Sequence, residues 1–169
     1  KDYDTDVTVT AVLPAPRGRT AATVGLVARG DLSHMEVAVA GRAPKPLHAM
    51  LVFDGRTDPS WSASIRSDEL DLALLSPALA SSAIAPLALD FTAAGKGGNA
   101  NLRGKVKQGD QELELAPSVV SLQDQVLKVS PLLVKGLGGE ARLEGTADFS
   151  QEGQQKLNFS VVAHDLTYV

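Results

Sequence analysis

The sequence predicts an all-β protein built from antiparallel strands. First, apolar and polar side chains alternate with a period of two over most of the 169 residues, which is typical of strands with one apolar and one polar face. Second, short turns containing Gly, Asp or Asn separate the alternating segments, so neighbouring strands are expected to form hairpins. Third, no stretch of convincing length follows the 3.6-residue period of a helix.

Five alternating segments precede an uncharged stretch in the middle of the chain. Residues 7–13 alternate Val, Ala and Leu with Thr, and residues 24–28 and 35–39 carry apolar residues at every second position. Residues 47–53 place Leu, Ala, Leu and Phe on one parity, and residues 61–65 alternate Trp, Ala and Ile with Ser. Turn signals interrupt the pattern at Gly30-Asp31, Gly41 and Asp54-Gly55.

The second half of the chain repeats the same alternation. The segments are residues 87–93, 100–106, 112–115, 127–133, 141–149 and 157–163. Turn signals between or beside them are Gly97-Gly98-Asn99, Gly109-Asp110, Gly136 with Gly138-Gly139, and Gly153. Leu102-x-Gly104 and Leu143-x-Gly145 form a faint internal echo, as expected of repeated hairpin units. The total approaches a dozen strands, more than most single sheets hold without curling.

The uncharged stretch, residues 72–89, approaches the length of a membrane span. It contains two prolines, several serines and many alanines, and acidic residues flank it, so residues 76–86 are predicted to be a loop or short helix. The segment before it, residues 67–75, is the best helical candidate because Ser67 could cap a helix. Its leucines also alternate, which favours a strand.

Charge and cysteine content exclude some classes of function. The net charge of −4 is unsuited to nucleic acid, because phosphate binding needs a basic stripe and the basic residues are scattered singly. The absence of cysteine excludes disulfides and thiolate metal sites, and it suits the periplasm. The ends of the chain carry no start signal or disordered tail, so we expect a piece of a longer protein with any anchor outside it.

A search for reactive groups predicts no enzyme, metal or cofactor. The histidines lack metal-ligand spacing and are predicted to lie on the surface: His34, His48 and His164. The acidic group Asp68, Glu69 and Asp71 is interpreted as a solvated turn. Gly95-Lys96-Gly97-Gly98 lacks the spacing of a phosphate loop and is predicted to be a hairpin turn. No Gly-x-Ser-x-Gly nucleophile motif occurs.

One-sided alternation leaves two architectures open. Two sheets could pack into a dry sandwich, or one sheet could curl and leave its apolar face lining a trough. In the second case, parity predicts the lining residues Leu87, Leu89, Phe91, Leu102, Val106, Leu113, Leu115, Leu127, Val129, Leu133, Leu143, Phe149, Leu157, Phe159 and Val161.

Four stretches resemble the TamB/AsmA-like family in their order and spacing. A recurrent Trp-led strand of the family, followed by a Leu-Asp-Leu segment, resembles the stretch WSASIRSDELDLALLSP. The family's strand, Gly-Asp-Leu turn and second strand resemble the stretch ATVGLVARGDLSHMEVAVAGR. The family's strand pairs with a Leu-x-Gly motif resemble two further stretches, LALDFTAAGKGGNANLRGKV and LKVSPLLVKGLGGEARLEGTADF. The resemblance covers most of residues 20–149 and has no point motif, so it transfers no lipid-binding residue.

The resemblance implies a periplasm-spanning protein anchored in the inner membrane of Gram-negative bacteria. Its fold would be a β-taco, a long curled, U-shaped antiparallel sheet with an apolar interior groove, and residues 1–169 would be one segment of it. The family is tied to phospholipid movement towards the outer membrane. TamB itself pairs with TamA, an outer-membrane barrel, in autotransporter assembly.

Three functions follow as hypotheses. The first is a non-catalytic conduit, since exposing an acyl chain of sixteen methylenes to water costs about 0.8 kcal/mol each, or roughly 13 kcal/mol in all. The second is a chaperone or scaffold of the translocation and assembly module that holds outer-membrane protein segments. The third is a plain β-sandwich or solenoid structural module. Expected partners are phospholipid or apolar protein segments and a TamA-like barrel, with no nucleic acid and no metal.

Overall fold

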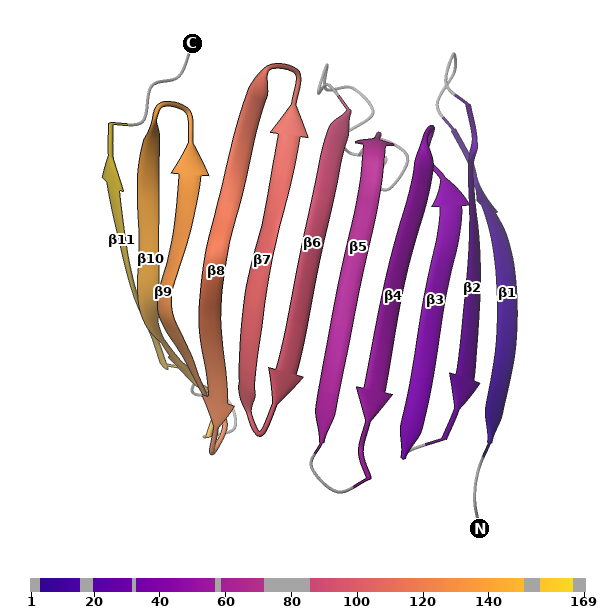
Figure 1. Cartoon of the computed structure of the whole chain (residues 1–169), viewed down its shortest axis with the longest axis horizontal. Helices are drawn as coiled ribbons and strands as arrows, with labels where there is room; N and C mark the ends of the chain where they lie inside the picture. The colour runs from indigo at the N-terminus through magenta and orange to yellow at the C-terminus, as the bar shows by residue number, and fades with distance from the viewer. Residues whose placement is uncertain are drawn as a thin grey trace.

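The structure, a computed structural model, describes residues 4–15, 20–31, 33–56, 59–71, 86–150 and 156–165. Within these residues the chain forms one open sheet of eleven antiparallel strands in the order β1 to β11, so each strand pairs with its neighbours in sequence (Figure 1). No helix occurs in the described ranges. The prediction of an all-β, antiparallel fold is confirmed, and the alternative of two packed sheets is not what these strands adopt.

The strand boundaries follow the alternating segments of the sequence. Most strands are longer than the alternating segments that predicted them, because backbone pairing continues up to the turn. The strands are β1 (Thr5–Leu13), β2 (Ala22–Gly30), β3 (His34–Arg42), β4 (Pro46–Asp54), β5 (Ser60–Leu70), β6 (Leu87–Lys96), β7 (Asn99–Gln108), β8 (Gln111–Gln123), β9 (Val126–Gly136), β10 (Gly139–Asp148) and β11 (Lys156–His164).

The segment 67–75 is a strand through Leu70, and Asp71 lies just beyond its end. β5 runs to Leu70, which agrees with the strand favoured by its alternating leucines. The rest of that segment and nearly all of the predicted loop, residues 72–85, lie outside the described residues. In the part of the chain that is described, no helix is long and apolar enough to span a bilayer.

Two-residue turns close several hairpins. Gly97 and Gly98 have φ of 55° and 79° between β6 and β7, as a type I′ turn requires, so the predicted hairpin turn there is confirmed. Leu137 and Gly138 join β9 to β10 with φ of 52° and 79°. Asp124 and Gln125 join β8 to β9 with φ of 48° and 63°, a turn that contains no glycine and that the sequence did not signal.

The sheet has almost no conventional core. The accessible surface of the whole chain is 11537 Å², whereas a compact monomer of 17.6 kDa has about 7,900 Å². No large side chain of the described residues is fully buried. A small cluster of Ala22, Ala43 and Leu70, packed with Leu13 and Leu89, covers one end of the strands. The fold is therefore a single layer whose two faces are largely open.

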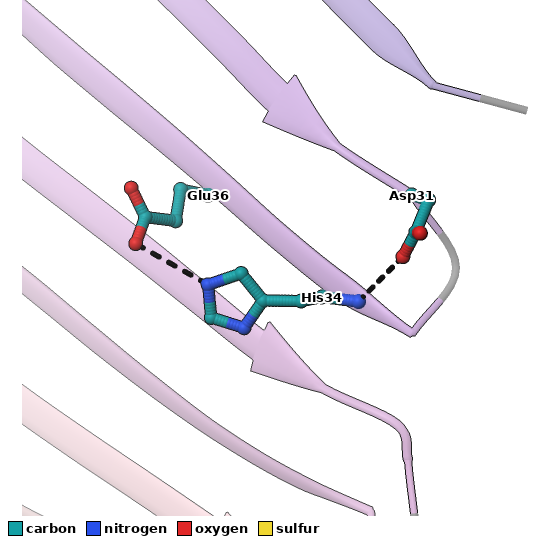
Figure 2. A network of polar contacts seen from close by, with 3 residues as sticks. All are labelled: Asp31, His34 and Glu36. Atoms are coloured by element: carbon teal, nitrogen blue, oxygen red, sulfur yellow. Dashed lines mark hydrogen bonds and ion pairs between the residues drawn. The ribbon is translucent and has the colours of Figure 1, made fainter.

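The turn between β2 and β3 is held by one carboxylate (Figure 2). Oδ1 of Asp31 accepts hydrogen bonds from the Ser33 amide at 2.7 Å, the Ser33 hydroxyl at 2.6 Å and the His34 amide at 2.8 Å. The Ser33 hydroxyl, followed by the His34 and Ser33 amides, lowers the pKa of Asp31 below its usual value. Nε2 of His34 also lies 3.4 Å from Oε1 of Glu36.

This turn is expected to weaken in acid. A carboxylate whose pKa is lowered in the folded state contributes stability above its unfolded pKa, about 3.9, and loses it as the pH falls through the folded pKa. The Asp31→Asn variant keeps an acceptor oxygen but does not titrate. We expect the wild type to have the higher urea midpoint at pH 6 and the difference to close below about pH 4. A difference that stays constant down to pH 3 would contradict this role of Asp31.

Candidate functional site

One side of the sheet carries an unbroken row of apolar residues. Directly opposed residues of an antiparallel pair share a face, so the register defines the row strand by strand. From β1 to β11 the row is Val9, Leu26, Val39, Ala49, Ile65, Phe91, Gly104, Leu115, Val134, Ala141 and Ala163. We call the side that carries this row the apolar face, and the other side the polar face. No charged residue interrupts the row across the eleven strands.

The polar face carries the charged residues and their ion pairs. Nζ of Lys105 lies 3.3 Å from Oε1 of Glu112 and 3.6 Å from Oε2 of Glu114. The pKa of Lys105 is raised above its usual value, mainly because Lys105 donates a hydrogen bond to Glu112. On β10, Nη2 of Arg142 lies 3.0 Å from Oε2 of Glu144. These pairs are half-exposed, so they keep the polar face hydrated and contribute little stability.

Most residues predicted to line the trough share the apolar face. The register places on it Leu87, Leu89, Phe91, Leu102, Val106, Leu113, Leu115, Leu127, Val129, Leu143, Leu157, Phe159 and Val161. Phe149 follows β10, where its amide donates a hydrogen bond to the Gln125 carbonyl at 3.0 Å. That these side chains hold lipid stays a prediction.

Leu133 is the exception, and its assignment is corrected. It lies opposite Arg142, on the polar face. The register between β9 and β10 shifts between the pairs Leu143–Leu132 and Gly145–Val129, so β9 has one extra residue near Pro131. That residue changes the parity, and Leu132 takes the place predicted for Leu133 on the apolar face. Pro131, which cannot donate a ladder hydrogen bond, was the available signal.

A hollow of about 450 Å³ lies over the middle strands of the apolar face. Ala49, Ala63 and Ala93 come from β4, β5 and β6, and their small side chains leave the space that larger neighbours surround. The apolar residues around it include Val37, Val39, Leu51, Ile65, Phe91, Leu102 and Leu115. The hollow is an open depression of the face and not an enclosed cavity. A U-shaped curl and a groove that continues along the whole sheet stay predictions.

A hollow of about 510 Å³ lies mainly over the polar face of the same strands. Its lining includes Ser62, Thr92, Asn101 and Arg103, so it offers hydrogen-bonding groups and a positive charge. Met50, Ala63, Ala93, Ala94 and Leu102 also border it, so its lining is mixed. The hollow on the apolar face is the candidate site because apolar residues form most of its lining and because the apolar row passes through it. Ser64, Thr92 and Arg103, which have the parity of the polar face, also border it.

Large apolar side chains on the apolar face are open to solvent. Ile65 is 36% exposed, Leu51 is 41% exposed and Val161 is 67% exposed. Residues of these types are normally buried in a soluble domain. An exposed apolar surface that spans a whole sheet typically marks a binding surface. The described part of the chain supplies no layer that covers it.

Three aromatic residues of the apolar face lie opposite glycines, an arrangement that parity alone did not reveal. The pairs are Trp61 with Gly95, Phe91 with Gly104, and Phe159 with Gly145. A Cβ added to any of the three glycines would overlap the opposing ring. The repeated Leu-x-Gly pattern was the available signal, since two of these glycines belong to it.

The polar groups considered in the sequence form no reactive cluster in the described residues. His48 and His164 lie on the polar face, opposite Arg66 and Glu140. The acidic group 68–71 is not a turn as interpreted, because β5 continues through Leu70. Asp68 lies 3.9 Å from Arg66 there. No group of three potential ligands able to hold a metal ion occurs in the described ranges.

Comparison with known proteins adds no assignment: no protein-family model, no curated protein and no solved structure matches this chain.

Proposed function

We propose that this chain is a segment of a TamB/AsmA-like periplasmic protein that conducts phospholipid acyl chains between the inner and outer membranes without catalysis. The observation that supports it is the apolar row that crosses eleven strands of a single open sheet. The anchor in the inner membrane and the contact with a TamA-like barrel would belong to the parent protein. In it, the sheet would curl so that the apolar face lines a continuous groove linked to outer-membrane biogenesis.

The chemistry of the apolar face suits transport better than tight binding. Covering about sixteen methylenes would remove most of the roughly 13 kcal/mol that their exposure to water costs. Aliphatic side chains make contacts without preferred direction, so an acyl chain could move from one strand to the next. The apolar row offers no charged group that would fix a headgroup in place. Transport requires a surface that shields the acyl chain from water but binds it weakly at each position.

Photo-crosslinking in cells tests the proposal. The chain, exported to the periplasm of a Gram-negative bacterium, would carry a photoreactive residue at Phe91 or Phe159 on the apolar face, with Thr92 and Ser160 on the polar face as matched controls. We expect phospholipid adducts at Phe91 and Phe159 in at least tenfold excess over Thr92 and Ser160. The absence of lipid adducts at Phe91 and Phe159 would overturn the proposal.

A chaperone function is the second candidate, and the edges of the sheet favour it. β1 and β11 each pair with a single strand in the described sheet, so each presents unpaired backbone groups to a further strand. Leu157 on β11 is 64% exposed. In the same experiment, adducts between Phe159 and outer-membrane barrel precursors would favour this function. A structural module would give neither kind of adduct.

A further inference from the structure

The two edge strands of the described sheet lack the features that normally prevent pairing with a further strand. β1 pairs with β2, and β11 with β10, without any register shift. The register shifts of the sheet occur between inner strands. Neither edge strand contains a proline. Natural sheets protect their edges with bulges, prolines or several charges, so these two regular edges are suited to pairing.

The edge strands also carry half of the large apolar residues that are exposed among the described residues. These are Val7, Val9, Val12, Leu157, Phe159, Val161 and Val162. Val12 and Val162 are the apolar exceptions among the polar-face positions of their strands, and they are 66% and 46% exposed. A further strand paired with either edge would cover such side chains.

The sequences of β1 and β11 match each other when they are aligned in the same direction. The two strands run parallel, since each strand between them reverses the direction (Figure 1). With Asp6 of one copy beside Lys156 of another, apolar residues meet on one face in the pairs Val7–Leu157, Val9–Phe159, Ala11–Val161 and Leu13–Ala163. The other face pairs Thr8–Asn158, Thr10–Ser160 and Val12–Val162. The two exposed valines of the polar face thus meet, and the apolar face continues from one copy to the next.

The same alignment joins two groups of charges into one alternating row on the polar face. In one copy, Lys156 on β11 lies opposite Asp148. At the other edge, Asp6 lies opposite Arg29, whose Nε is 3.5 Å from Oδ1 of Asp6, and Arg29 lies opposite Glu36. Across the junction the row would run Asp148, Lys156, Asp6, Arg29 and Glu36, and the charge would change sign at every step. Opposite charges on neighbouring strands favour their pairing, and like charges oppose it.

Pairing between two like edges does not reproduce these matches. Two copies of β11 related by a twofold axis would be antiparallel, and their full overlap would place Lys156 opposite His164. Two copies of β1 in full overlap would place Asp6 opposite Val12. Neither arrangement gives Asp6 or Lys156 a new partner of opposite charge. Charge complementarity therefore favours contact between unlike edges.

We propose that copies of this chain join head to tail, with β1 of one copy added in parallel to β11 of the next, in the register that places Asp6 beside Lys156. This goes beyond the proposed function and does not depend on it, because the contact uses the edges of the sheet and leaves the apolar face open. The joined copies form one sheet with one continuous apolar face. Because the two edges differ, each added copy presents a new edge to another.

Cysteine cross-linking of the purified chain tests the register, since the wild type has no cysteine. A mixture of Thr8→Cys and Asn158→Cys should form a disulfide between the two variants, because aligned residues of neighbouring strands are about 5 Å apart. Val12→Cys mixed with Asn158→Cys is the matched control, since position 12 is on the same face but about 13 Å further along the strand. We expect at least tenfold more cross-linking in the first mixture. Equal yields, or an equal yield from Asn158→Cys alone, would overturn the proposed contact.

Charge reversal tests the partner by sedimentation velocity at about 20 mM salt, where surface charges are weakly screened. The wild type should form oligomers that grow with concentration. Asp6→Lys alone and Lys156→Asp alone should each associate at least tenfold more weakly, because like charges would meet. An equimolar mixture of the two variants should associate as the wild type does, since each new charge then meets its opposite on the other variant. Recovery in the mixture also shows that both variants are folded.

The remaining outcomes would overturn the inference without affecting the proposed function. A wild type that stays monomeric would leave the edges to a different strand, such as a client of the chaperone candidate. Association that neither charge reversal weakens, or that the mixture fails to restore, would exclude the pairing of Asp6 with Lys156. Association that becomes stronger at high salt would assign the contact to the apolar face. None of these results bears on whether the apolar face binds phospholipid.

Discussion

Replacing Ala93 with aspartate is expected to reduce photolabelling of the purified chain by a diazirine-bearing palmitic acid at least tenfold, whereas the same replacement at Ala94 leaves it within twofold of the wild type. The two residues are neighbours on β6 and lie on opposite faces, opposite Ala63 and Ser62 respectively. A carboxylate at 93 would lie in the hollow, where contact with a hydrocarbon chain would strip its water. A tenfold loss corresponds to about 1.4 kcal/mol, well within the cost of such desolvation.

Because positions 93 and 94 are neighbours on one strand, the two aspartate variants should have similar stability. Aspartate disfavours strands at both, so urea unfolding should show similar midpoints for Ala93→Asp and Ala94→Asp. If both variants bind the probe equally, the apolar face is not where it binds, and the candidate site is misplaced.

Gly41→Val is expected to lower the free energy of unfolding by about 3 kcal/mol. Gly41 lies opposite Val24 in the β2–β3 pair, and an added Cβ would overlap the backbone carbonyl oxygen of Thr23. Backbone cannot rotate away as a side chain can, so the two strands must separate locally. Urea unfolding followed by far-UV circular dichroism measures the change.

Gly25→Ala supplies the comparison for this effect. Gly25 is also in the β2–β3 pair, but a Cβ there has room. The loss of backbone freedom in the unfolded chain should make this variant equal to the wild type or more stable by up to about 1 kcal/mol. Equal destabilisation by the two changes would show that glycine matters in this sheet for some reason other than the space at Gly41.

The sequence predicted the strands well because alternation is a local property. The Trp61 to Ile65 pattern, for example, needs only the pleat of β5 to separate its apolar and serine side chains. Parity failed at Leu133, where the extra residue near Pro131 inverts the faces. It also gave no sign of the turn at Asp124 and Gln125, because the residues that usually adopt positive φ are glycines.

The candidate site was harder to predict because it depends on register. The hollow depends on register because Ala63 and Ala93 are directly opposed on β5 and β6 and Ala49 on β4 lies diagonal to Ala63. A shift of one residue between two of these strands would put their alanines on opposite faces. The pairing of Phe91 with Gly104 depends on register in the same way. Whether one sheet or two would form also depends on tertiary packing, which alternation alone leaves open.

The central claim, that the apolar face is open until a hydrocarbon chain covers it, is tested most directly by spin labels along β6. The chain has no cysteine, so single cysteines at each position from 87 to 96 can be labelled without background. Without lipid, we expect oxygen to reach the labels on both faces. With phosphatidylethanolamine and phosphatidylglycerol added, labels at 87, 89, 91 and 93 should become protected from a water-soluble nickel reagent, and those at even positions should not. Labels at 87, 89, 91 and 93 that are immobile and inaccessible before any lipid is added would contradict the claim.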